Sequence, residues 1–166
     1  VENYLPCEFR GEPSRDGIVP ILLQVGSWDT AGITQLIRNN ELPLSSFLQY
    51  WAYMFDSLHY HLYQESMKEN QMVFIDEVCD LSGMTLQQFS PAFVSTVLKP
   101  WMDLTQSNYP ETARRILFLR PPRILRLVWT LVTPLASPGT VAKISLKSDF
   151  TGSGKDYFHQ TYSKLQ

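Results

Sequence analysis

The chain has 166 residues, of which 44% are hydrophobic and 18% charged, so its composition excludes a disordered protein and its length fits one domain with a single core. Two cysteines, Cys7 and Cys79, make neither a disulfide framework nor a metal knuckle, which favours a reducing compartment. The N-terminal stretch has no apolar signal segment, and the longest apolar-rich run, Ile124 to Ala136, is too short to cross a bilayer, so we expect a soluble cytoplasmic domain.

The first predicted element is a strand. Asp16-Gly17 has the composition of a turn, and the branched apolar residues from Val19 to Val25 are typical of a strand. Pro20 stands near its start, where a sheet tolerates a missing donor. A loop is expected from Gly26 onward.

A long helix is predicted next. Large apolar side chains recur there at intervals of three or four residues: Leu48, Trp51, Phe55, Leu58 and Leu62. Ser45 or Ser46 can cap its start. This apolar stripe indicates a helix packed on the core rather than a cofactor site.

The middle of the chain predicts a second strand and the start of a second helix. The strand spans Gln71 to Asp80 and is followed by the turn "DLSGM". Thr85 and Gln88 have the spacing of a capping box.

Ser90 and Pro91 are an alternative start for this second helix, which runs toward Trp101. Pro100 lies inside it and is expected to kink or end it unless the proline is locally accommodated.

The last third predicts two strands, Arg115 to Leu119 and Ile144 to Leu146, with helical segments between them. An apolar helix covers Ile124 to Val132, and a short helix starts with Ser137 as its cap and Pro138 at its first position. Strands that alternate with helices predict an α/β domain with a mixed, largely parallel sheet.

Charge is unevenly distributed along the chain. The segment from Thr112 to Ser148 contains no Asp or Glu but holds seven of the fourteen cations: Arg114, Arg115, Arg120, Arg123, Arg126, Lys143 and Lys147. This pattern fits a solvated basic face. It also fits a surface that faces an anion such as a phosphate backbone or acidic lipid.

Catalytic and metal-binding patterns are weak. His61 and Glu65 share a helix face, but His59 points elsewhere, so these three side chains do not converge on a metal. The carboxylates at the end of the second strand are not accompanied by a nucleophile, and strand alternation places Asp76 and Glu77 on opposite faces. We therefore expect no catalytic residues, no metal and no cofactor.

Two further ligand classes are disfavoured. "GSGKD" near the C-terminus lacks the glycine spacing and the Ser or Thr of a phosphate-binding loop. Between Arg114 and Arg126 the only aromatic residue is Phe118, so the stacking residues of a nucleic-acid groove are missing.

A family resemblance rests on ordered motifs. "DLSGM", a helix, and then "NYPETARRILFLRPPRILRLVWTLVTPLASPGTVAKI" resemble the CRAL-TRIO lipid-binding domain, the fold of phosphatidylinositol-transfer, tocopherol-transfer and retinaldehyde-binding proteins. Upstream, "RDGIVPILLQVGSWDTAGI" is similar to the family's first strand and loop, so the resemblance covers about residues 10–148. The chain 1–166 is thus expected to be a single lipid-binding domain, without the family's N-terminal helical subdomain and its last segment.

The resemblance implies a sheet that forms the floor of an apolar lipid pocket and a mobile amphipathic helix that gates it. The matching helix spans about Ile124 to Pro134. The resemblance assigns the pocket-facing side of this helix to Leu125, Val128, Trp129 and Val132, and the membrane-facing charge to Arg120, Arg123 and Arg126. An ordinary core helix with arginines that reach toward solvent is the alternative.

Headgroup residues are also implied by the resemblance. Members that bind phosphatidylinositol carry a Glu, a Thr and a Lys at positions that match Glu111, Thr140 and Lys143. A structural ion pair between Glu111 and Lys143 is the alternative. Choline-lipid binding is not expected, because Ile75 and Glu77 replace small hydroxylated residues.

The expected function is therefore non-catalytic. One amphipathic lipid, phosphatidylinositol or a related lipid, would be taken into an enclosed pocket and exchanged at an acidic membrane, with which the cytoplasmic protein associates transiently. The alternative is a scaffold-type protein-interaction module within a larger signalling or trafficking protein. No nucleic-acid partner is expected.

Overall fold

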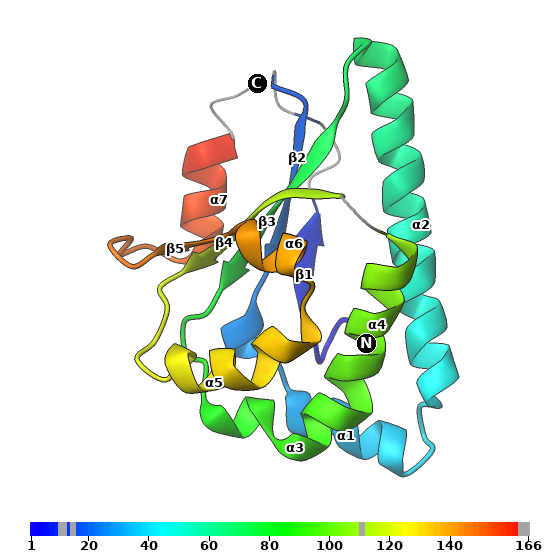
Figure 1. The fold of residues 1–166 in the computed structure, drawn as a ribbon, viewed down its shortest axis with the longest axis vertical. Coiled ribbons are helices and arrows are strands. Elements are labelled where there is room, and N and C mark those ends of the chain that lie inside the picture. Colours follow the sequence, from blue (N-terminus) through cyan, green and yellow to red (C-terminus); the bar gives the residue numbers. More distant parts are fainter. Residues whose placement is uncertain (10–12, 14–15, 110–111, 163–166) are drawn as a thin grey trace.

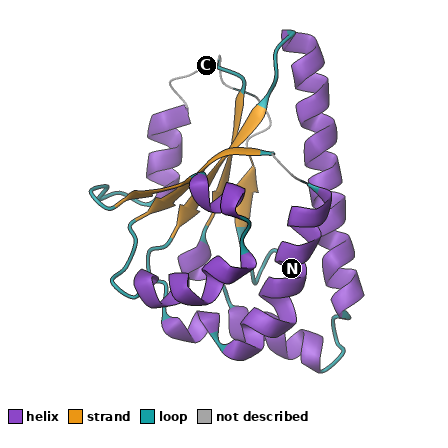
Figure 2. Ribbon diagram, in the orientation of Figure 1, coloured by secondary structure: helices purple, strands orange, loops and turns teal. Residues whose placement is uncertain are grey.

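A computed structural model describes residues 1–9, 13, 16–109 and 112–162. It contains one five-stranded sheet in the order β1-β2-β3-β4-β5, with β2 to β5 parallel and β1 antiparallel to β2 (Figures 1 and 2). The strands are β1 Cys7–Phe9, β2 Ile18–Leu23, β3 Phe74–Asp80, β4 Ala113–Leu119 and β5 Ile144–Lys147. The predicted α/β class with a mixed, largely parallel sheet is confirmed.

Helices connect the parallel strands, because a chain that returns to a parallel neighbour needs a crossover connection of about a dozen residues or more. The α-helices are α1 Thr30–Arg38, α2 Leu44–Glu69, α3 Pro91–Phe93, α4 Lys99–Asn108, α5 Leu125–Val132, α6 Pro138–Ala142 and α7 Gly154–Tyr162. Shorter turns of 3₁₀-helix are η1 Val25–Ser27, η2 Leu86–Phe89 and η4 Thr133–Leu135. Within the described residues, no helix combines the length and the apolar character needed to span a bilayer.

The two faces of the sheet are covered differently. Helix α7 packs on one face against β2 and β3, while α2, α4, α5 and α6 lie over the other (Figure 1). Alternation along β3 separates the side chains, so that Val78 packs in the cluster that contains Tyr162 of α7, whereas Cys79 belongs to the core under the other helices.

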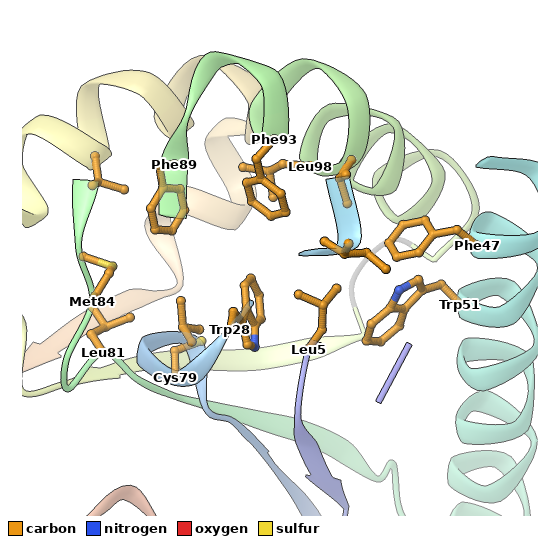
Figure 3. Close-up of a cluster of buried hydrophobic side chains, with 14 of the residues drawn as sticks. Leu5, Trp28, Phe47, Trp51, Cys79, Leu81, Met84, Phe89, Phe93 and Leu98 are labelled. Carbon is orange, nitrogen blue, oxygen red and sulfur yellow. The ribbon is translucent and has the colours of Figure 1, made fainter. Parts of the chain in front are cut away.

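The main core lies at one end of that second face and is rich in aromatic rings. Phe47 and Trp51 project from α2 toward Trp28 and Leu5 (Figure 3). The ring centroids of Trp51 and Trp101 are 4.8 Å apart, and those of Trp28 and Trp101 are 5.9 Å apart. This cluster anchors α2 and α4 above the sheet.

Two elements were not predicted. Strand β1 is only three residues long, too short for a periodic signal. Helix α1 lies where a loop was expected after Gly26; Asp29 caps it by accepting a hydrogen bond from the amide of Gly32 at 2.8 Å. Strand β2 also ends at Leu23, two residues before the predicted end.

Helix starts were predicted with mixed success. The capping box of Thr85 and Gln88 is present, and Ser90 and Ser137 both act as caps, each followed by proline. The prediction of a serine cap for α2 was wrong: the helix begins at Leu44, directly after Pro43, which has no side-chain donor or acceptor to offer.

Pro100 neither breaks nor ends its helix. A π-helical turn, η3 Val94–Leu98, lies between α3 and α4 directly before Pro100, so the hydrogen-bond pattern is already irregular where Pro100 lacks an amide hydrogen. The chain thus runs in helical conformation from Pro91 to Asn108.

An irregular pairing shapes the face of the sheet under α7. Ile75 pairs with Ala113 but the next residue, Asp76, pairs with Arg115, so Arg114 is an extra residue in β4. Because of this bulge both arginines reach the Asp76 carboxylate, at 2.9 Å and 2.7 Å. The hydroxyl of Tyr162 donates to the same carboxylate at 3.0 Å and ties α7 to the sheet.

Candidate functional site

A cavity of ≈ 370 Å³ lies between the sheet and the helices on the face away from α7. The sheet side chains that form its floor come from four adjacent strands and alternate as the pleat requires: Ile21, Leu23, Ile75, Glu77, Cys79, Ala113, Ile116, Phe118 and Ile144. All are apolar except Glu77. This volume falls within the range of cavities that bind small organic ligands.

The walls of the cavity are largely aromatic. Rings from the helices and from the sheet line it: Trp28, Phe55, Phe89, Trp101, Tyr109, Phe118 and Trp129. Phe118 of β4 and Trp129 of α5 meet edge to face with ring centroids 5.9 Å apart, which joins the floor to the wall. A cavity of this kind favours hydrocarbon and planar groups.

Helix α5 forms one wall. Leu125, Val128, Trp129 and Val132 recur at three- and four-residue spacing, and all four side chains line the cavity. The opposite side of α5 exposes two leucines, Leu127 at 58% and Leu131 at 50%. The helix is therefore apolar both on the side that faces the cavity and on the side that faces solvent.

The three arginines assigned to a membrane-facing surface do not lie in equivalent environments. Arg123 and Arg126 are exposed at the start of α5. Arg120 has a positive φ of 49° and donates to both carboxylate oxygens of Asp80, and only 25% of its side chain is exposed. The guanidinium of Arg120 is thus engaged by β3, and the exposed basic pair consists of Arg123 and Arg126.

Two of the three assigned headgroup residues lie at the cavity. Thr140 and Lys143 both line it, where α6 leads into β5. The hydroxyl of Thr140 is 2.9 Å from that of Ser137, and the Lys143 carbonyl accepts a hydrogen bond from the Ile116 amide at 2.9 Å, which fixes α6 on the sheet. Glu111, the third residue, lies outside the described residues.

Glu77 belongs to this cavity and was not assigned to a site from the sequence. The Cys79 thiol donates to its Oε1 at 3.4 Å. Burial raises the pKa of the Glu77 carboxyl, and burial beside Glu77 raises the pKa of the Cys79 thiol well above its ordinary value. Strand alternation predicted correctly that Asp76 and Glu77 face opposite sides of the sheet, but it did not indicate which of the two faces the cavity.

The histidines assemble no metal site with their neighbours. His59 uses both ring nitrogens inside the fold, one 2.8 Å from the Phe55 carbonyl and the other 2.7 Å from the Thr112 hydroxyl. Among the residues that the structure describes, no three His, Cys, Asp or Glu side chains are grouped so as to hold a metal ion.

Comparison with known proteins gives relatives along most of the chain. Residues 10–163 match the family model described as the CRAL/TRIO domain. Proteins named "Protein real-time" from Anopheles gambiae and Aedes aegypti are each 26% identical over 152 residues, covering 86% of this chain but only 20% and 21% of their own lengths. The chain thus spans about a fifth of these curated relatives.

A solved structure has the same architecture. The crystal structure of Sfh5 aligns with a TM-score of 0.57 at 15% sequence identity, covering 97% of this chain and 51% of Sfh5. At this identity the likeness concerns the fold. Together with the family model, which matches nearly the whole chain, it leads to the conclusion that this protein belongs to the CRAL/TRIO domain family.

Proposed function

We propose that the chain binds a single amphipathic lipid, phosphatidylinositol or a related lipid, in the cavity above the sheet and exchanges it at membranes. The observation that carries this proposal is the composition of the cavity: apolar and aromatic on nearly all sides, with Thr140 and Lys143 together on one of them. Such a site suits a ligand with a long apolar part and one anionic group.

The apolar part of the lipid would lie between the sheet and α5. Burial of each methylene group contributes about 0.8 kcal/mol, a gain that a bilayer offers equally, so extraction depends on a closely fitting cavity. The rings of Phe118 and Trp129, which already touch, supply flat walls against which hydrocarbon packs.

The anionic part would meet Lys143 and Thr140. An ammonium group and a hydroxyl can both donate to phosphate oxygens, and both belong to the short α6 segment that the Ile116 amide holds in place. Glu111 is kept in the proposal on the family resemblance, as an acceptor for inositol hydroxyls.

Helix α5 would act as the gate. Its cavity side closes over the lipid, and its outer side, with Leu127, Leu131 and the exposed Arg123 and Arg126, would enter the surface of an acidic membrane when the helix moves outward.

Transfer measurements with matched variants test this proposal. Lys143→Ala, alone and with Glu111→Ala, should lose most phosphatidylinositol transfer between vesicles while thermal unfolding stays cooperative. Lys147→Ala is the control, because Lys147 is the nearest cation along β5 and pairs with Asp149 at 3.7 Å outside the cavity. Undiminished transfer by the folded double variant would reject the headgroup assignment.

A protein-interaction module is the second candidate function. It is favoured by a row of exposed side chains along one face of α2, namely Tyr53, Tyr60, Tyr63 and Met67, and by relatives several times longer than this chain. Native mass spectrometry separates the two candidates, since a carrier retains a lipid mass through purification and an interaction module does not.

A further inference from the structure

Among the described residues, the floor of the cavity contains one carboxyl side chain, and its setting is unusual. Glu77 stands in the middle of β3, the central strand of the sheet, where its strand neighbours on either side are Ile21 and Ile116. Ile75 and Cys79 precede and follow it on the same face. A carboxyl group has thus been placed in an otherwise apolar floor.

The carboxyl of Glu77 lacks the partners that an ionised group needs. Within the described residues its one recorded hydrogen bond is with the Cys79 thiol, a weak donor, at 3.4 Å, and no Lys or Arg pairs with it. Burial raises its pKa accordingly. In its protonated form, which a raised pKa favours, the carboxyl carries an O–H donor, and a donor without an acceptor in an apolar cavity is costly, so the side chain is suited to donate to a ligand inside the cavity.

Glu77 also lies in line with the headgroup residues. It pairs with Ile116, which pairs in turn with Ile144, and the Ile116 amide donates at 2.9 Å to the carbonyl of Lys143, the residue before Ile144. Two strand spacings of about 4.8 Å put the backbones of Glu77 and Lys143 roughly 10 Å apart. If a lipid phosphate lies at Lys143, the next polar groups along a glycerolipid are the ester linkages, and the centre of the sheet lies within their reach.

We propose that the carboxyl of Glu77 donates a hydrogen bond to an ester carbonyl oxygen of the bound lipid and thereby selects ester-linked over ether-linked glycerolipids. This inference rests on the proposed lipid-binding function and adds a selectivity determinant to it. An ether oxygen at the same place is a much poorer acceptor and has no carbonyl to offer. One neutral hydrogen bond of this kind corresponds to a preference of about fivefold.

A competition experiment tests the preference directly. The chain is incubated with phosphatidylcholine vesicles that contain equal amounts of diester and diether phosphatidylinositol, re-isolated, and its bound lipids are counted by mass spectrometry. Wild type should retain about five diester molecules for each diether molecule. Because the two lipids compete for one protein, the ratio is independent of overall affinity and of the folded fraction.

Three variants make the outcome specific to the Glu77 hydrogen bond. Glu77→Met removes the donor and should bring the ratio close to one. Glu77→Gln keeps a donor in the amide nitrogen and should retain the preference. Glu69→Met makes the same change on the exposed end of α2 and should match wild type.

Several results would overturn the proposal. An unchanged preference in Glu77→Met, or no preference in wild type, excludes the ester contact while lipid binding itself stands. If wild type retains neither form of phosphatidylinositol, both the ester contact and the proposed lipid-binding function are rejected. Phosphatidylethanolamine can be added to the same vesicles. If wild type enriches this lipid and Glu77→Met does not, then Glu77 is ionised and binds an ammonium group instead.

Discussion

The Arg120 guanidinium donates through Nη2 to both carboxylate oxygens of Asp80, at 2.7 Å and 2.6 Å. Asp80 also accepts from the backbone amides of Ser82 and Gly154, at 3.0 Å and 2.8 Å. This one carboxylate therefore joins the ends of β3 and β4 to the turn after β3 and to the first residue of α7.

Replacing Asp80 by Ala should destabilise the fold by about 2–3 kcal/mol, because a partly buried guanidinium and a buried amide lose their acceptor together. Urea denaturation monitored by circular dichroism measures the change. Asp149→Ala is the control: Asp149 is exposed, its pair with Lys147 is 3.7 Å long, and a change below about 0.5 kcal/mol is expected. Equal effects of the two variants would show that Asp80 does not join these elements.

Gly154 is predicted to be intolerant of any side chain. A Cβ atom there would lie 2.6 Å from Oδ2 of Asp80 and 2.7 Å from its Cβ, so Gly154→Ala must displace α7 or the carboxylate, at a cost of about 1–3 kcal/mol. Gly139 also lies in the first turn of a short helix, but its nearest neighbour would be 3.7 Å away, so Gly139→Ala should be neutral or slightly stabilising. Differential scanning fluorimetry of both variants checks this contrast.

The stability of the protein should depend on the ionisation of Glu77. Because burial raises the folded-state pKa of this carboxyl, the unfolded chain releases the proton first as pH rises, and the free energy of unfolding falls from about pH 4 upward until the folded-state pKa is passed. Glu77→Gln lacks this ionisable carboxyl, so the stability of the variant relative to wild type should increase with pH over that range.

Urea titrations of wild type and Glu77→Gln at several pH values measure this difference. Cys79 and Tyr109 line the same cavity, but burial raises both of their pKa values, so they ionise at higher pH than this window. Lys143 lines the cavity as well and is present in both proteins that are compared. If the difference in unfolding free energy between the two proteins stays constant from pH 4 upward, the folded-state pKa of Glu77 is not raised.

Arg123 and Arg126 should control attraction to acidic membranes. Each cation near such a surface contributes about 1 kcal/mol, so the double change to Gln should weaken binding to phosphatidylserine vesicles by roughly thirtyfold at low salt, and less at high salt. Vesicle flotation gives the partition. The double variant Arg38→Gln with Lys68→Gln removes two exposed cations elsewhere and should bind like wild type, unless net charge alone drives the association.

The sequence was informative where side-chain periodicity and serine–proline caps determine the structure. Proline after a serine cap located α3 and α6, and alternation of side chains separated Asp76 from Glu77. It was uninformative where long-range contacts decide. Arg120 appeared as one more basic residue near an apolar helix, and only the position of Asp80, 40 residues earlier, shows that its charge is engaged.

The site shows the same division. Helical spacing places Leu125 and Val132 on one side of α5, and the family resemblance identified that side as the one that faces the pocket. Glu77 required knowing which face of β3 is covered by α7 and which by the cavity, and a single strand does not contain that information.

The register in which β3 pairs with β4, including the bulge at Arg114, determines which side chains of β3 face α7 and which face the cavity. With both arginines held by Asp76, a slip of β3 by one residue would bring Asp76 and Asp80 into the cavity and Glu77 under α7. A one-residue insertion or deletion before Asp76 should therefore abolish folding rather than alter ligand choice. We therefore expect changes at Asp76 and Asp80 to be detected by unfolding alone, and a change at Glu77 to alter both the pH dependence of unfolding and the proposed preference between lipids.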